Sequence, residues 1–152
     1  MQNLVDPFIE ATASVFSTMI GWDVVAGNPE HHLQDGECEL RSLIGLSGQT
    51  SGVVMVQWTE NVALKAAGAL LGSEPTSVNA DVVDTIGEIT NMTVGSFKNT
   101  LCDLGFPCKL TLPAIVRGQN LSIAAIRSAT RHVFHFECAG HRMAVDIQLK
   151  ME

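Results

Sequence analysis

The chain has 152 residues, of which 46% are hydrophobic and 16% are charged, and its formal net charge at pH 7 is -7. This composition supports one folded domain over residues 1–152 and argues against a disordered chain. The negative charge argues against nucleic-acid binding through phosphate neutralisation and against attachment to an anionic membrane surface.

The N-terminal segment lacks the pattern of a secretory signal, because Asp6, Pro7 and Glu10 interrupt it. No apolar stretch reaches the roughly 20 residues needed to span a bilayer. The four cysteines include no C-x-x-C pair, and in a reducing compartment such residues are small apolar side chains. We therefore expect a cytoplasmic protein.

The first part of the chain is predicted to form a helix, a short strand, a hairpin and a second helix. Asp6 and Pro7 favour a helix start with Asp6 as the N-cap, and Gly21 favours its end. The pattern of β-forming and turn residues then predicts four segments: a strand over 22–26, hairpin strands over 38–46 and 52–58, and a helix over 60–71 capped by Thr59.

The second part opens with the longest predicted helix, over about 80–104, which Gly105 ends. Strands are predicted over 108–116, 131–138 and 142–150, with a strand or irregular stretch over 121–126. The order helix, strand, hairpin thus occurs twice, which indicates a weak internal repeat. The expected fold is one α+β domain, with a mixed, mostly antiparallel sheet and long helices packed on one face.

The long helix has two faces at about 100° per residue. Its apolar stripe, which should face the core, comprises Val83, Ile86, Thr90, Val94, Phe97 and Leu101. A second stripe, roughly 100° away and therefore expected to be exposed, comprises Asp84, Glu88, Asn91, Gly95, Lys98 and Cys102. Glu88 and Asn91 lie one turn apart, but any solvated helix face can carry such a pair.

Residues 87–95 read G-E-I-T-N-M-T-V-G, which resembles the G-E-x-x-N-x-x-x-G signature of the CheC/CheX/FliY family of response-regulator phosphatases. The length and the order of elements resemble that family over essentially the whole chain. The resemblance implies an enzyme that hydrolyses the aspartyl phosphate of a CheY-like receiver domain in chemotaxis or another two-component pathway. It also implies a CheC-like internal repeat.

The same resemblance implies roles for individual residues. Asn91 would orient the attacking water, and Glu88 would pair with a lysine of the receiver domain. Asp84, Gly95 and Lys98 would belong to the partner-binding face. Mg²⁺ would be held by the receiver, so that this chain binds no metal or cofactor of its own.

In the first helix Glu10 is followed three residues later by Ala13, which has no amide to hold a water. One site per chain is the pattern of the CheX branch of the family. That branch further implies a homodimer built through the sheets, for which an edge strand over 53–58 or the final hairpin would supply the contact.

Two rival interpretations come from other classes of protein. The same helix could dock a receiver or a flagellar partner without hydrolysis, as a non-catalytic interaction module. Alternatively, the polar stripe is solvated surface on a structural protein. A metal site is not expected, because the regularly spaced residues His132, His135, Cys138 and His141 would alternate between opposite faces of their strands.

Overall fold

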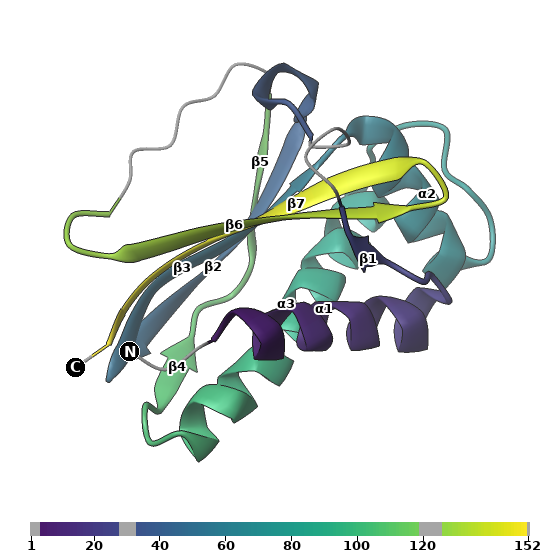
Figure 1. The fold of residues 1–152 in the computed structure, drawn as a ribbon. Helices are drawn as coiled ribbons and strands as arrows, with labels where there is room; N and C mark the ends of the chain where they lie inside the picture. Colours follow the sequence, from purple (N-terminus) through teal and green to yellow (C-terminus); the bar gives the residue numbers. More distant parts are fainter. Residues whose placement is uncertain (1–3, 28–32, 119–125, 152) are drawn as a thin grey trace.

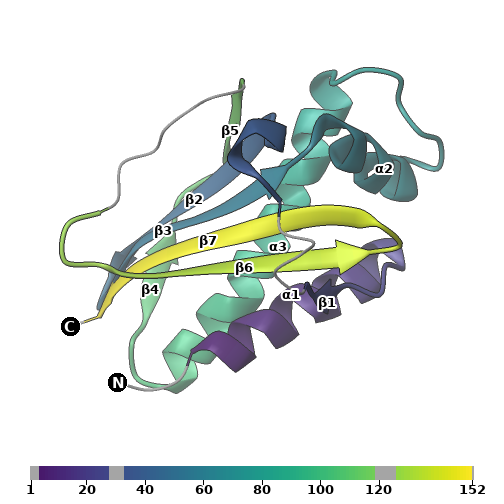
Figure 2. The ribbon, with the colours of Figure 1, turned by 45° about the horizontal axis from the view of Figure 1, so that its top comes forward.

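The computed structural model describes residues 4–27, 33–118 and 126–151 (Figure 1). Three helices cover one face of a single sheet (Figures 1 and 2). In chain order the elements are α1 (Val5–Ile20), β1 (Val25–Ala26), the 3-10 turn η2 (Asp35–Glu37), β2 (Leu40–Gly48), β3 (Thr50–Trp58), α2 (Glu60–Leu71), α3 (Ala80–Asp103), β4 (Cys108–Leu110), β5 (Ala114–Arg117), β6 (Thr130–Cys138) and β7 (His141–Met151).

The described strands form one seven-stranded sheet in the order β1-β6-β7-β3-β2-β4, and β5 also pairs with β2. Every pairing among them is antiparallel. The predicted α+β fold, with a mostly antiparallel sheet and helices on one face, is confirmed. None of the described helices is both long and apolar enough to cross a membrane.

The sheet order supports the internal repeat. In the two halves of the chain, β1 corresponds to β4, β2 to β6 and β3 to β7. When each strand is replaced by its counterpart, the order of strands across the sheet is the same order read from the other edge. Each short strand therefore pairs with the hairpin of the other half: β1 with β6, and β4 with β2. The two repeat helices also end alike, since Gly21 and Gly105 have left-handed φ values of 71° and 90°. An L side chain would be strained there.

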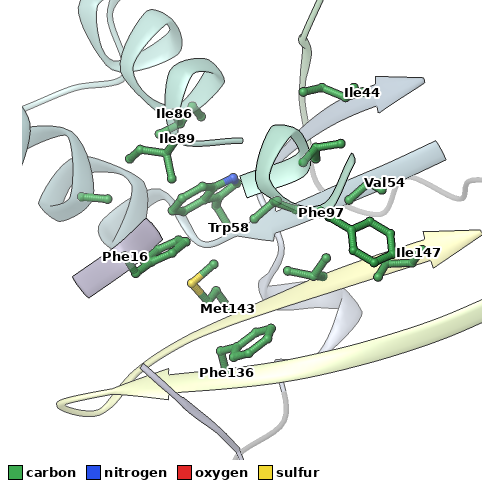
Figure 3. Close-up of a cluster of buried hydrophobic side chains, with 14 of the residues drawn as sticks. Phe16, Ile44, Val54, Trp58, Ile86, Ile89, Phe97, Phe136, Met143 and Ile147 are labelled. Atoms are coloured by element: carbon green, nitrogen blue, oxygen red, sulfur yellow. The ribbon is translucent and has the colours of Figure 1, made fainter. Parts of the chain in front are cut away.

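The core lies between the helices and the sheet and contains most of the large apolar side chains (Figure 3). The two repeat helices meet through Phe8 and Phe97, whose ring centroids lie 4.6 Å apart in an edge-to-face arrangement. Trp58 at the end of β3 is fully buried and stacks on Phe16 at 6.1 Å. These contacts fix α1 and α3 against each other and against the middle of the sheet.

Four local predictions were wrong. Helix α1 begins at Val5 without a side-chain cap, so that Asp6 lies in the first turn instead of capping the helix. The strand predicted over 22–26 is reduced to β1. The strand predicted over 108–116 is two strands, because Pro113 has no N–H for the ladder.

The fourth wrong prediction concerns the edge of the sheet. Residues 53–58 are not an edge, since β3 pairs with β2 and β7. Most of the segment predicted over 121–126 lies outside the described residues.

Candidate active site

The candidate site lies on α3, whose ends are defined by its sequence. The Asn79 side chain caps the start, where its Oδ1 accepts the Val82 N–H at 3.0 Å. At the other end the Gly105 N–H bonds to the Cys102 carbonyl, and the left-handed Gly105 ends the helix. A regular helix of 24 residues results, and it presents side chains at fixed angular positions.

The apolar stripe of α3 faces the core, as predicted. Ile86, Thr90, Val94, Phe97 and Leu101 are all buried, whereas Val83 is half-buried. This stripe packs on β2 and β3 and against α1 and α2. The orientation of the helix about its own axis is therefore set by a well-filled core.

A buried polar chain also fixes this orientation, and sequence reasoning missed it. The Trp58 indole N–H donates to Ser42 Oγ at 3.0 Å, and Ser42 Oγ lies 2.6 Å from Thr90 Oγ1. Thr90 in turn donates to the Ile86 carbonyl at 2.7 Å. Because the single Thr90 hydroxyl hydrogen is used there, Ser42 must donate to Thr90. These hydrogen bonds tie α3 to β2 at Thr90, one residue before Asn91.

The second stripe of α3 is open to solvent. Asp84, Glu88, Asn91 and Cys102 are exposed, and Gly95 and Lys98 are half-buried. A Cβ added at Gly95 would meet no atom within 4 Å, apart from the helix's own backbone and the adjoining residues. The predicted exposure is confirmed for the first four of these residues. The roles assigned to its individual residues stay predictions.

The charges along this face are unevenly distributed. Asp81, Asp84 and Glu88 are exposed carboxylates in the N-terminal half of α3, and Lys98 lies in the C-terminal half. Acidic side chains near a helix N-terminus interact favourably with the helix dipole. An approaching partner therefore meets negative charge at one end of the stripe, an amide and an open glycine in the middle, and a cation beyond them.

The site is an open helix face, and the two best-formed cavities of the described residues lie elsewhere. The best-formed cavity, of about 310 Å³, lies between the start of α1 and the β6–β7 hairpin, and residues such as Leu4, His132 and Leu149 line it. Neither Glu88 nor Asn91 lines it. An open polar helix face is suited to entering a pocket on another macromolecule, whereas small-molecule sites are concave.

Within the described residues no group of three or more His, Cys, Asp or Glu is placed to hold a metal ion. His132 stacks on Phe134, while His135 accepts a hydrogen bond from the Leu33 N–H at 3.3 Å. The first repeat helix carries no second copy of the site: Glu10 is exposed and Ala13 is half-buried.

Residues 40–137, which make up more than half of the chain and include the whole of α3, match the family model for the chemotaxis phosphatase CheX. The chain belongs to the CheX family. A curated relative, the CheY-P phosphatase CheX of Thermotoga maritima, is 27% identical over 123 residues, which is 79% of each protein.

Solved structures of CheX proteins share the fold. The chemotaxis protein CheX from Vibrio vulnificus matches with a TM-score of 0.85 at 27% identity, and the match covers 98% of this chain and 97% of that one. CheX in the CheX–CheY–BeF3–Mg²⁺ complex from Borrelia burgdorferi matches with a TM-score of 0.81 at 24% identity, over 97% of this chain and 98% of that one. At that identity the likeness establishes the fold.

Proposed function

We propose that this chain is a phosphatase for the aspartyl phosphate of a response-regulator receiver domain. The observation that carries the proposal is the open polar stripe with Glu88 and Asn91 on α3, whose apolar stripe is buried, in a chain of the CheX family. Support comes from the Thermotoga maritima relative, which is a CheY-P phosphatase, and from the Borrelia burgdorferi structure, in which CheX is bound to CheY.

In the proposed mechanism α3 enters the receiver site and Asn91 holds a water in line with the acyl phosphate. A side-chain amide both accepts from and donates to a water, so that it can fix the attacking lone pair. The water oxygen bonds to phosphorus, and the bond from phosphorus to the aspartate oxygen breaks. The products are inorganic phosphate and the free carboxylate, and the water proton leaves with phosphate or solvent. Positioning supplies most of the acceleration.

Glu88 acts as the docking group in this proposal. One turn from Asn91, its carboxylate pairs with the cationic lysine of the receiver site through a charge-assisted hydrogen bond. Asp84, Gly95 and Lys98 extend the contact along the same stripe, where Gly95 permits close backbone approach. The Mg²⁺ that neutralises the phosphate belongs to the receiver.

The test is the decay of acyl phosphate on a panel of CheY-type receiver domains phosphorylated by a small-molecule phosphodonor. Wild-type chain should accelerate decay on at least one receiver. Glu88→Gln should lower the acceleration on the order of tenfold to a hundredfold, because one charge-assisted contact is lost. The matched control is Glu10→Gln, at the equivalent exposed position of α1, which should behave as wild type. Equal losses of acceleration in both variants would show that Glu88 does not belong to the site.

The alternative, a non-catalytic module that docks a receiver or a flagellar partner, makes a different prediction in the same assay. It would bind the phosphorylated receiver without shortening the lifetime of the acyl phosphate. A structural protein would show neither binding nor acceleration across the panel.

We also propose a homodimer. The central position of β3 excludes the edge contact that the sequence indicated for residues 53–58. In the dimer α3 must stay open, because Glu88 and Asn91 have to reach the receiver. Light scattering of the homodimer should give twice the chain mass. Glu88→Lys should not change this mass, because α3 lies outside the dimer contact. Monomers at micromolar concentration would contradict the dimer.

A further inference from the structure

A short connector between β4 and β5, residues 111–113, runs alongside α3 (Figures 1 and 2). Its backbone is held firmly on one side by β2. The Thr111 N–H donates to the Gly45 carbonyl at 2.9 Å, and Thr111 Oγ1 accepts the Gly45 N–H at 2.8 Å. Immediately after the connector, β5 pairs with β2 from Ala114 onward. The connector is therefore fixed at both ends.

The connector also borders the exposed stripe. A Cβ on Gly87 would lie 3.6 Å from Pro113 Cγ and 4.0 Å from Ile115 Cδ1. Gly87 lies one turn before Asn91 and only about 40° from it around the helix axis. Pro113 therefore covers the helix flank on the Asn91 side, and Leu112 precedes it in the same connector.

Leu112 is 89% exposed, more than the other exposed large hydrophobic residues of the described chain, of which the next, Val25, is 63% exposed. A single exposed apolar residue is ordinary on a protein surface. Leu112 differs because its backbone is pinned and because it adjoins the candidate site. A leucine held in this way loses little backbone entropy when a partner covers it.

The stripe itself offers no large apolar side chain, since its members are Asp84, Glu88, Asn91, Gly95, Lys98 and Cys102. Beyond the Glu88 contact, exposed charge pairs contribute little to affinity, whereas a few buried apolar or aromatic anchors commonly contribute much of it. A receiver domain that takes up Glu88 and Asn91 must also approach the connector, because the connector flanks the same turn of α3.

We propose that Leu112 is an apolar anchor for the receiver domain, and that it packs into an apolar patch beside the acyl-phosphate site as α3 enters. This inference rests on the proposed phosphatase function and assigns a second contact to the same docking event. Leu112 determines affinity for the receiver and takes no part in the hydrolytic step, since the connector carries no group that could hold the water.

The test compares wild type with Leu112→Ser, Leu112→Met and the control Val25→Ser. Val25 is an exposed apolar residue on β1, at the opposite edge of the sheet from β4. Acyl-phosphate decay on the receiver that wild type serves best is measured at increasing concentrations of the chain. The curve yields a half-saturating concentration and a maximal rate constant for each variant, and thermal unfolding verifies that all four proteins fold.

Leu112→Ser should raise the half-saturating concentration on the order of tenfold, with a maximal rate constant within about twofold of wild type. Leu112→Met, which keeps an apolar side chain, should stay close to wild type, and so should Val25→Ser. If Leu112→Ser has the same half-saturating concentration as Val25→Ser, the anchor role of Leu112 is overturned. Activity of the wild type would then still support the phosphatase function. A fall in maximal rate alone would also overturn it. No acceleration by wild type on any receiver would overturn both proposals.

Discussion

The hydroxyl oxygens of Ser42 and Thr90 lie 2.6 Å apart in the core, although 48 residues separate them in the chain. Both side chains are fully buried. Together they join the middle of β2 to the turn of α3 that carries Asn91 on its other side. In the proposed mechanism the Asn91 amide has to be held to within a fraction of an ångström, and this contact would contribute to holding it there.

Replacing Ser42 by Ala should lower the free energy of unfolding by about 1–3 kcal/mol, because the buried Trp58 N–H would lose its acceptor and Thr90 its donor. Urea unfolding followed by tryptophan fluorescence measures the change. The matched control, Ser14→Ala on the exposed face of α1, should shift stability by no more than about 0.5 kcal/mol. Equal effects of the two substitutions would show that the buried hydroxyl chain contributes nothing.

Gly95 leads to a prediction in which stability and activity move in opposite directions. Gly95→Ala should raise the free energy of unfolding by about 0.5–1 kcal/mol, because the helix gains a better former and the methyl group meets open space. The same methyl group should weaken receiver docking. Ser96→Ala, about 100° around the helix, should stabilise α3 without weakening docking. Undiminished docking by Gly95→Ala would exclude Gly95 from the contact.

The cysteines should differ in reactivity towards a thiol-alkylating reagent. Cys102 is exposed and Cys108 is buried. Burial raises the pKa of the Cys108 thiol above its ordinary value of 9.0; neighbouring Cys102 raises it further and Lys98 opposes the shift. Because the thiolate reacts, Cys108 should be alkylated far more slowly than Cys102 at pH 8, and its rate should still rise above pH 9. Mass spectrometry of the labelled peptides measures both rates, and simultaneous labelling would contradict the assigned burial.

The sequence was most informative where a local pattern determines the structure. Helix α2 spans the predicted residues 60–71, because the Thr59 cap at its start and the left-handed Gly72 at its end act locally. The 100° periodicity of α3 separated its buried stripe from its exposed stripe, since a helix of that length must bury its apolar face. The predicted site residues could therefore be placed on one exposed face without a structure.

Contacts between distant segments could not be predicted in this way. Nothing in the alternation of residues 53–58 distinguishes a central strand from an edge, because that depends on β7, about ninety residues later in the chain. The break at Pro113 was detectable, since proline is unsuited to the interior of a strand. The hydroxyl contact between Ser42 and Thr90 left no local signal. Its detection requires the register between α3 and β2.

The water-positioning role of Asn91 is isolated by comparing wild type with Asn91→Ala on one phosphorylated receiver. Binding to the receiver and the decay of its acyl phosphate are measured side by side. We predict that Asn91→Ala binds within about threefold of wild type and loses about a hundredfold or more of the acceleration. Acyl-phosphate decay as fast with Asn91→Ala as with wild type would exclude Asn91 from the positioning of the water.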